Sequence, residues 1–169
     1  MPSYAVLLRG INVGTAKRVA MADLRALLTV DGYTDVRTHL NSGNVILTGK
    51  SAQPARLEKA ITKSTGLDVR CVVLTAKELR AIIDGHPLSG VATNGSRMMA
   101  HVLGAEPDAD ELADALALDP DNARPGPRVI YQWCPDGLLK APPITAKIGV
   151  PVTGRNWNTM TKLDELISA

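Results

Sequence analysis

Apolar and polar positions along residues 1–75 follow two spacings, one typical of strands and one typical of helices. The pattern indicates six elements, bounded by turn-forming residues. Helix signals support the assignment, because Pro54 opens one apolar period and Gly66 follows it. In chain order we expect a strand over 4–9, a helix from Met21 to before Gly32, strands over 36–40 and 45–48, a helix from Pro54, and a strand over 67–74.

Residues 76–169 also mix the two spacings. Thr75 and Glu78 have the spacing of a capping box, so a helix is expected to begin there. We further expect a strand over 98–103, a helix over 107–118, an irregular connection over 119–127, a strand over 128–133, a short return strand at 138–139, helical turns over 142–148 and a last helix capped by Asn156 or Asn158.

These elements predict an α+β protein of two units. The order strand, helix, strand, strand, helix, strand indicates a ferredoxin-like (split βαβ) N-terminal half over residues 1–75. A related, irregular α+β unit over residues 76–169 is expected to pack against it. The total of 169 residues suits one domain or two small ones.

Composition excludes several classes of protein. The chain is 45% hydrophobic and 21% charged, as is ordinary for a globular protein, and no apolar run is long enough to span a membrane. With no signal segment at the N-terminus, we expect a cytoplasmic protein whose two cysteines, Cys71 and Cys134, are reduced thiols. The net charge of +2 falls far short of a nucleic-acid binder's basic footprint.

A glycine-rich loop after the first strand is the clearest candidate site. Gly10 and Gly14 allow a ligand or another backbone to approach closely, and exposed N–H groups in such a loop can cradle an anion. The spacing matches neither a P-loop nor a dinucleotide fingerprint. The alternative is a tight loop packed over the sheet. The polar and glycine positions of the loop are Arg9, Gly10, Asn12, Gly14, Lys17 and Arg18.

A second polar cluster lies at the turn between the two short strands, at Asn41, Ser42, Gly43 and Asn44. These are hairpin-turn residues, and turn formation alone could explain them. In a ferredoxin-like sheet, however, this turn and the glycine-rich loop lie at the same end of neighbouring strands. We therefore expect the two clusters to meet.

A third cluster, residues 153–159, directly precedes the expected last helix. Helix N-termini bind anions readily, and Arg155 could add a bidentate guanidinium. Asn156 completes the candidate site. A capped helix beside a buried Trp157 and a surface arginine is the alternative.

No reaction is indicated by the remaining polar residues. His39, His86 and His101 are isolated, so we expect no metal site, and no motif indicates a cofactor. There is no nucleophile elbow and no paired-carboxylate signature. The sequence therefore indicates no catalytic residue.

Several segments together resemble a bacterial family, the domain of unknown function 1697. The matching segments are Leu7–Gly14, Met21–Arg25, Asp35–Thr38, Ser42–Val45 and Arg155–Thr159 with Lys162 and Leu163. Thr15 stands where the family usually has a glycine, and Leu47 where it often has an aromatic. The resemblance implies a compact α+β fold and no established activity, substrate or cofactor.

The sequence favours a protein that binds a small anionic ligand, bearing phosphate or carboxylate, in a loop-lined pocket. An enzyme acting on small phosphorylated or carboxylated substrates is one alternative, and weak nucleic-acid binding is another, although aromatic residues are few. A purely structural or oligomeric role is also open, and no subunit number is predicted.

Overall fold

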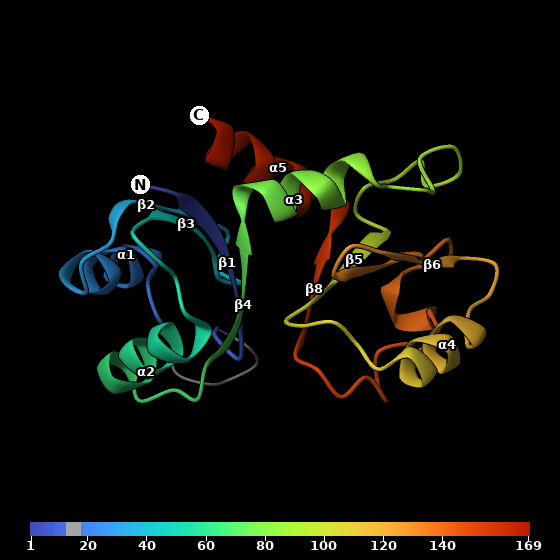
Figure 1. Cartoon of the computed structure of the whole chain (residues 1–169), viewed down its shortest axis with the longest axis horizontal. Coiled ribbons are helices and arrows are strands. Elements are labelled where there is room, and N and C mark those ends of the chain that lie inside the picture. The colour runs from blue at the N-terminus through green and yellow to red at the C-terminus, as the bar shows by residue number, and fades with distance from the viewer. Residues whose placement is uncertain (13–17) are drawn as a thin grey trace. The chain divides into compact units, whose positions relative to one another are not determined.

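The structure is a computed structural model that describes residues 1–12 and 18–169 (Figure 1). The chain divides into two compact units, one of Met1–Leu79 with Leu163–Ala169 and one of Arg80–Lys162. The sequence suggested a division after residue 75. In the structure the division falls within helix α3 (Ala76–Asp84), and the C-terminal residues join the first unit.

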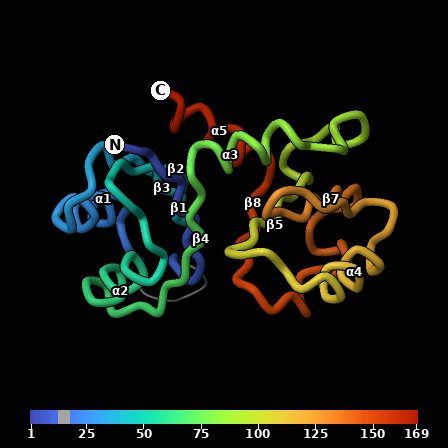
Figure 2. The backbone as a smooth tube through the Cα atoms, in the orientation of Figure 1, coloured from blue at the N-terminus to red at the C-terminus, as the bar shows by residue number. Residues whose placement is uncertain are grey.

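The first unit contains a four-stranded antiparallel sheet and two helices that cover one of its faces (Figures 1 and 2). The strand order is β2-β3-β1-β4, which is compatible with the split βαβ arrangement. The element order expected from the sequence is confirmed. The elements are β1 (Ser3–Arg9), α1 (Met21–Val30), β2 (Thr34–His39), β3 (Asn44–Thr48), α2 (Pro54–Thr65) and β4 (Arg70–Thr75).

Strand alternation sorts the residues of β1 between the two faces of this sheet. Val6 and Leu8 belong to one buried cluster with Leu24 and Leu28 of α1 and with apolar residues of α2. Neighbouring strand residues point to opposite faces, so Leu7 and Arg9 lie on the face away from these helices. This division decides which polar residues can share a site.

Local sequence signals place the helix ends. Thr75 Oγ1 accepts a hydrogen bond from the Glu78 N–H at 3.1 Å, and Glu78 Oε1 accepts one from the Thr75 N–H at 2.9 Å. The capping box is therefore confirmed. Gly66 follows α2 with φ 75°, a left-handed conformation that glycine adopts without strain.

The second unit repeats the strand order of the first, as β6-β7-β5-β8. A short 3-10 helix and turns stand between β7 and β8, where the first unit has α2. The elements are β5 (Met98–Leu103), α4 (Ala109–Ala117), β6 (Ala123–Gly126), β7 (Val129–Trp133), η1 (Leu138–Lys140), β8 (Val152–Asn156) and the first part of α5 (Trp157–Ser168), whose residues from Leu163 onward belong to the first unit.

Two sequence expectations for these segments are wrong. Residues 123–126 form edge strand β6, because Pro125 is tolerated where one side of a strand has no neighbour. Residues 138–139 lie in a 3-10 helix rather than in a return strand. Residues 142–148 contain turns, and residues 152–156, where no element was expected, form β8. In the first unit, β4 starts at Arg70, later than expected.

No helix in the described part of the chain combines the length and apolar character needed to cross a lipid bilayer.

Candidate functional site

The glycine-rich loop and the β2–β3 turn meet in the first unit, as the strand order led us to expect. The Leu8 N–H donates a hydrogen bond to the Gly43 carbonyl at 2.8 Å. Further along the loop, Asn12 Nδ2 donates to the Asn41 carbonyl at 2.9 Å. The two clusters are therefore joined by hydrogen bonds.

Asn12 is a structural cross-link rather than a group free to meet a ligand. Its Nδ2 donates also to the Val19 carbonyl at 2.9 Å, and its Oδ1 accepts the Val19 N–H at 2.7 Å. Both amide hydrogens and the amide oxygen are thus used within the protein. Asn12 has φ 53°, a conformation that asparagine tolerates better than most residues.

The glycines let the two segments approach closely. Gly10 has φ 87°, and a Cβ built there would lie 3.0 Å from the Asp68 carbonyl oxygen. Gly43 has φ 90°, and a Cβ there would lie 2.8 Å from both Leu8 Cβ and Ile11 Cγ2. Packing therefore explains these two glycines without a ligand.

Asn44 and Ser42 also serve the hairpin. Asn44 is fully buried, and its Nδ2 donates to the His39 carbonyl at 2.8 Å and to Ser42 Oγ at 3.1 Å. The structure places Ser42 in the turn and Asn44 at the start of β3, and turn formation accounts for both residues.

A cavity of about 490 Å³ lies where the clusters meet. The Arg18 Nη1 donates to the Asn12 carbonyl at 2.6 Å, which ties this side chain to the cavity wall. Ala20, the N-cap of α1, has no side-chain acceptor for the first N–H groups of the helix, and its backbone carbonyl accepts the Asp23 and Leu24 N–H groups at 3.0 and 3.1 Å. The cavity is lined by Asn12, Arg18, Val19, Ala20, Asp23 and Asn41.

Of the expected site residues, Asn12 and Asn41 line this cavity, whereas Arg9 does not. Arg9 lies on the sheet face away from α1, opposite Arg70 of β4. Gly14 and Lys17 lie outside the described residues. The sequence pattern placed Arg18 among the polar positions of the loop but did not assign Arg18 or Asp23 to the site. The apolar spacing that starts α1 at Met21 could have placed both beside a helix N-terminus.

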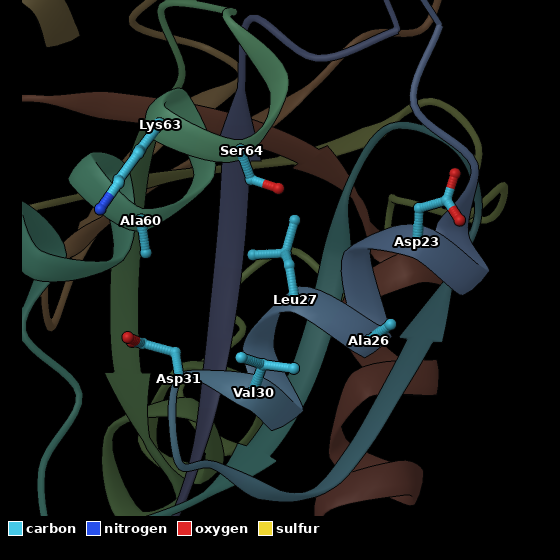
Figure 3. Close-up of a pocket in the computed structure, with 8 residues that line it drawn as sticks. All are labelled: Asp23, Ala26, Leu27, Val30, Asp31, Ala60, Lys63 and Ser64. Carbon is cyan, nitrogen blue, oxygen red and sulfur yellow. The ribbon is translucent and has the colours of Figure 1, made fainter.

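Two further cavities continue from this one along the helices. A cavity of about 250 Å³ shares Arg18, Val19 and Asp23 with it. A third, of about 610 Å³, lies between α1 and α2 and shares Asp23 with both (Figure 3). Asp23 therefore stands at the junction of all three.

The third polar cluster belongs to the second unit and supplies none of the lining of the first cavity. Arg155 lies in β8 opposite Ala100, and its Nη1 donates to the Gly154 carbonyl at 3.0 Å. Burial lowers the pKa of Arg155 to about 10. Asn156 Oδ1 accepts the Thr159 N–H at 3.0 Å, so Asn156 acts as the cap of α5.

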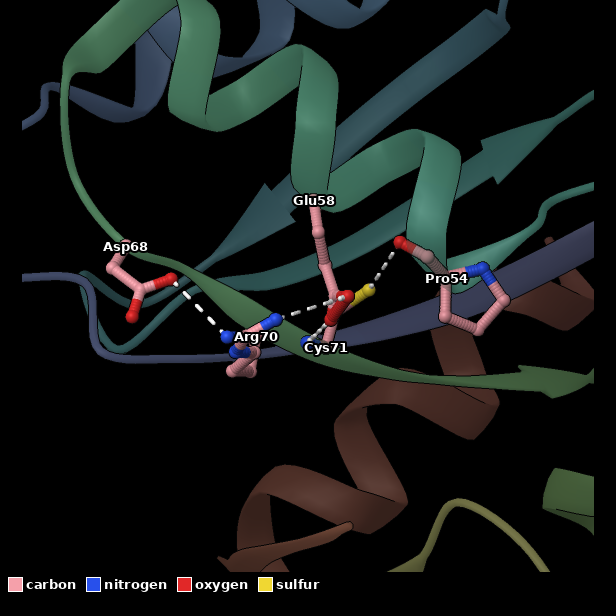
Figure 4. Close-up of polar contacts among 5 residues, drawn as sticks. All are labelled: Pro54, Glu58, Asp68, Arg70 and Cys71. Atoms are coloured by element: carbon pink, nitrogen blue, oxygen red, sulfur yellow. Dashed lines mark hydrogen bonds and ion pairs between the residues drawn. The ribbon is translucent and has the colours of Figure 1, made fainter.

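Cys71 shows how the first unit holds its buried thiol (Figure 4). Its N–H donates to Glu58 Oε2 at 3.1 Å, and its Sγ donates to the Pro54 carbonyl at 3.6 Å. Burial, and secondarily the charge of Glu58, raise the pKa of the thiol to about 12. The Arg70 guanidinium forms ion pairs with both neighbouring carboxylates, with Nη1 4.0 Å from Glu58 Oε1 and Nη2 3.6 Å from Asp68 Oδ1. Such a thiol is a poor nucleophile.

The second unit contains a buried polar chain that begins at His101. Its Nε2 lies 2.9 Å from Gln132 Oε1, and Gln132 Nε2 donates to Asp119 Oδ2 at 2.9 Å and to the Pro142 carbonyl at 3.1 Å. Burial lowers the pKa of His101. This polar chain ties the Pro142 backbone to the sheet. Among the described residues, no group of three or more His, Cys, Asp or Glu side chains could hold a metal ion.

Comparison with known proteins supports the fold and leaves the activity open. The family model described as "Protein of unknown function (DUF1697)" matches residues 1–131. A solved structure, that of the conserved bacterial protein SP0830 from Streptococcus pneumoniae, is 23% identical, with a TM-score of 0.71 over 98% of each chain. Comparison with curated proteins yields no match.

Proposed function

The chain belongs to the DUF1697 family, whose function is unknown, and on that premise we propose, from the cavity of its first unit, that it binds a small anionic ligand there. The ligand would carry a phosphate or carboxylate group. The observation that carries the proposal is the position of Arg18, fixed through the Asn12 carbonyl at the edge of a 490 Å³ cavity beside the N-terminus of α1.

Arg18 suits this role because its guanidinium is planar and presents several donors. Arg18 Nη1 donates to the Asn12 carbonyl, and the other N–H groups of the guanidinium can form a bidentate pair with a carboxylate or phosphate. The N-terminus of α1 adds partial positive charge and N–H donors on the same side. Asn41, which lines the cavity, can add an amide.

Asp23 opposes an anion in this cavity. It lies in the first turn of α1 and lines the same cavity as Arg18. Its carboxylate repels a bound anion, so removing its charge should strengthen binding while removing that of Arg18 should weaken it. Opposite effects from two neighbouring substitutions would be a specific signature of this cavity.

The experiment is calorimetric titration with inorganic phosphate, acetate and a panel of phosphorylated metabolites. We expect Arg18→Ala to weaken binding about tenfold or more, as loss of a charge-assisted pair implies, and Asp23→Asn to strengthen it. Lys59→Ala, an exposed cation outside the cavity lining, is the charge-matched control for Arg18→Ala. Absence of binding to wild type, or equal binding by wild type and Arg18→Ala, would reject the proposal.

Neither the enzyme nor the nucleic-acid alternative has a comparable observation. Asp23 is the one carboxylate among the described residues that line the cavity, so a catalytic reading lacks a second acid–base partner. For nucleic acid, Tyr33 is buried and cannot stack on a base.

A further inference from the structure

A groove between α1 and α2 presents an apolar strip on the outside of the first unit. The strip consists of Ala26, Leu27 and Val30 from α1 and Ala60 from α2, within a cavity of about 610 Å³ (Figure 3). The α1 residues have the spacing of one helix face. Because two of the four side chains are alanines, another helix could approach closely.

Val30 marks this strip as unusual for a solvent-facing helix. It is 89% exposed, although other large apolar residues of α1, Leu24 and Leu28, are buried. A β-branched apolar side chain contributes little to an exposed helix position, where polar residues or alanine serve as well. Its exposure is typical of a surface that another protein molecule covers.

The walls of the groove carry opposite charges. Asp23 stands on the α1 wall and Lys63 on the α2 wall (Figure 3). Among the described residues neither side chain forms an ion pair, whereas Asp31 at the other end of α1 pairs with Arg56 at 3.6 Å. One acidic wall and one basic wall therefore flank the apolar strip.

We infer that this groove is the interface at which two copies of the chain associate about a two-fold axis. A two-fold interface must be complementary to itself, because the same patch is present on both sides. An antiparallel arrangement lays the α1 wall of one copy against the α2 wall of the other. Asp23 of each copy then faces Lys63 of the partner subunit, so the two-fold axis generates two identical ion pairs. The apolar strips of the two copies cover each other between these pairs.

The interface also bears on the anion cavity, although it does not depend on the proposed function. Asp23 is common to the groove and to that cavity. The contact would bring Lys63 of the partner subunit to the carboxylate that opposes anion binding. The association itself is measured without any ligand.

Sedimentation equilibrium across the micromolar range tests the proposal. We expect wild-type protein to shift with concentration from 17.9 kDa toward twice that mass. Lys63→Glu should raise the dimer dissociation constant about tenfold, since each substitution acts at two symmetric positions and creates like-charge contacts. The double variant Asp23→Lys with Lys63→Glu exchanges the charges and should restore the dimer.

Val30→Glu tests the apolar strip and should give a monomer. Val91→Glu, at a position 56% exposed in the second unit, is its matched control and should still form the dimer. Circular dichroism and melting curves verify that each variant is folded. A monomeric wild type, a dimer insensitive to Val30→Glu, or a charge-exchanged double variant as weak as Lys63→Glu would each overturn the inference, and so would association only with a different protein.

Discussion

The Asn12 side chain holds the backbone of Asn41 in the β2–β3 turn, with Nδ2 donating to the Asn41 carbonyl at 2.9 Å. The same amide also donates to the Val19 carbonyl and accepts a hydrogen bond from the Val19 N–H. One side chain therefore sets the relative positions of the glycine-rich loop, the β2–β3 turn and the start of α1. The cavity shape depends on this cross-link, whether or not a ligand is present.

We expect Asn12→Ala to lower the free energy of unfolding by about 2 kcal/mol, because three hydrogen bonds are lost and their backbone partners are left less well satisfied. Asn41→Ala keeps the backbone carbonyl that Asn12 uses, so its effect should stay within about 0.5 kcal/mol. Urea unfolding followed by circular dichroism measures both. Equal effects from the two substitutions would contradict the cross-link.

Gly43→Ala should destabilise the protein for two reasons, its positive φ and the contact of a new Cβ with Leu8 and Ile11 at 2.8 Å. Gly32→Ala is the matched control, since Gly32 has φ 105° with no atom within 4 Å of a built Cβ. We expect about 1 kcal/mol for Gly32→Ala from backbone strain and about 1–3 kcal/mol more for Gly43→Ala from overpacking. Thermal and urea unfolding distinguish them. The packing argument fails if the two variants unfold alike.

Sequence reasoning succeeded where the determinants are local. Pro54 and Gly66 bound α2, and the Thr75–Glu78 capping box starts α3, because each signal acts over three or four residues. The meeting of the two polar clusters was also predictable, since it follows from strand order once the α+β pattern is known.

It failed where pairing between distant segments decides the structure. Residues 152–156 lack an apolar alternation and become a strand by pairing with β5, about 50 residues earlier in the chain. Pro125 indicated a break, but an edge strand accommodates it. Likewise, Arg18 is held at the cavity through the Asn12 carbonyl, a contact that no residue spacing indicates.

Both cysteines should react slowly with a thiol reagent in the folded protein. Both are free and buried in the structure. Burial raises the pKa of Cys71 to about 12 and also raises that of Cys134, so little thiolate forms near neutral pH. Ellman titration should find almost no fast-reacting thiol in buffer and two in urea. A thiol that reacts fast in buffer would show an opening that the structure does not contain.

Acidification should destabilise the protein through His101. Burial lowers the pKa of His101 in the folded state below 6.5, although its hydrogen bond with Gln132 acts in the opposite direction. Between the folded pKa and 6.5 the unfolded chain binds more protons, so stability is full above 6.5 and is lost as the pH falls through this window.

Burial shifts the pKa of His86 in the same direction, so His101→Gln should reduce the loss of unfolding free energy between about pH 7.5 and about pH 5.5 without abolishing it. Urea unfolding at the two pH values measures the difference, and His39→Gln, at a position in β2 outside the buried polar chain, is the control. If His101→Gln leaves the pH dependence of wild type unchanged, His101 is not the group that couples folding to pH.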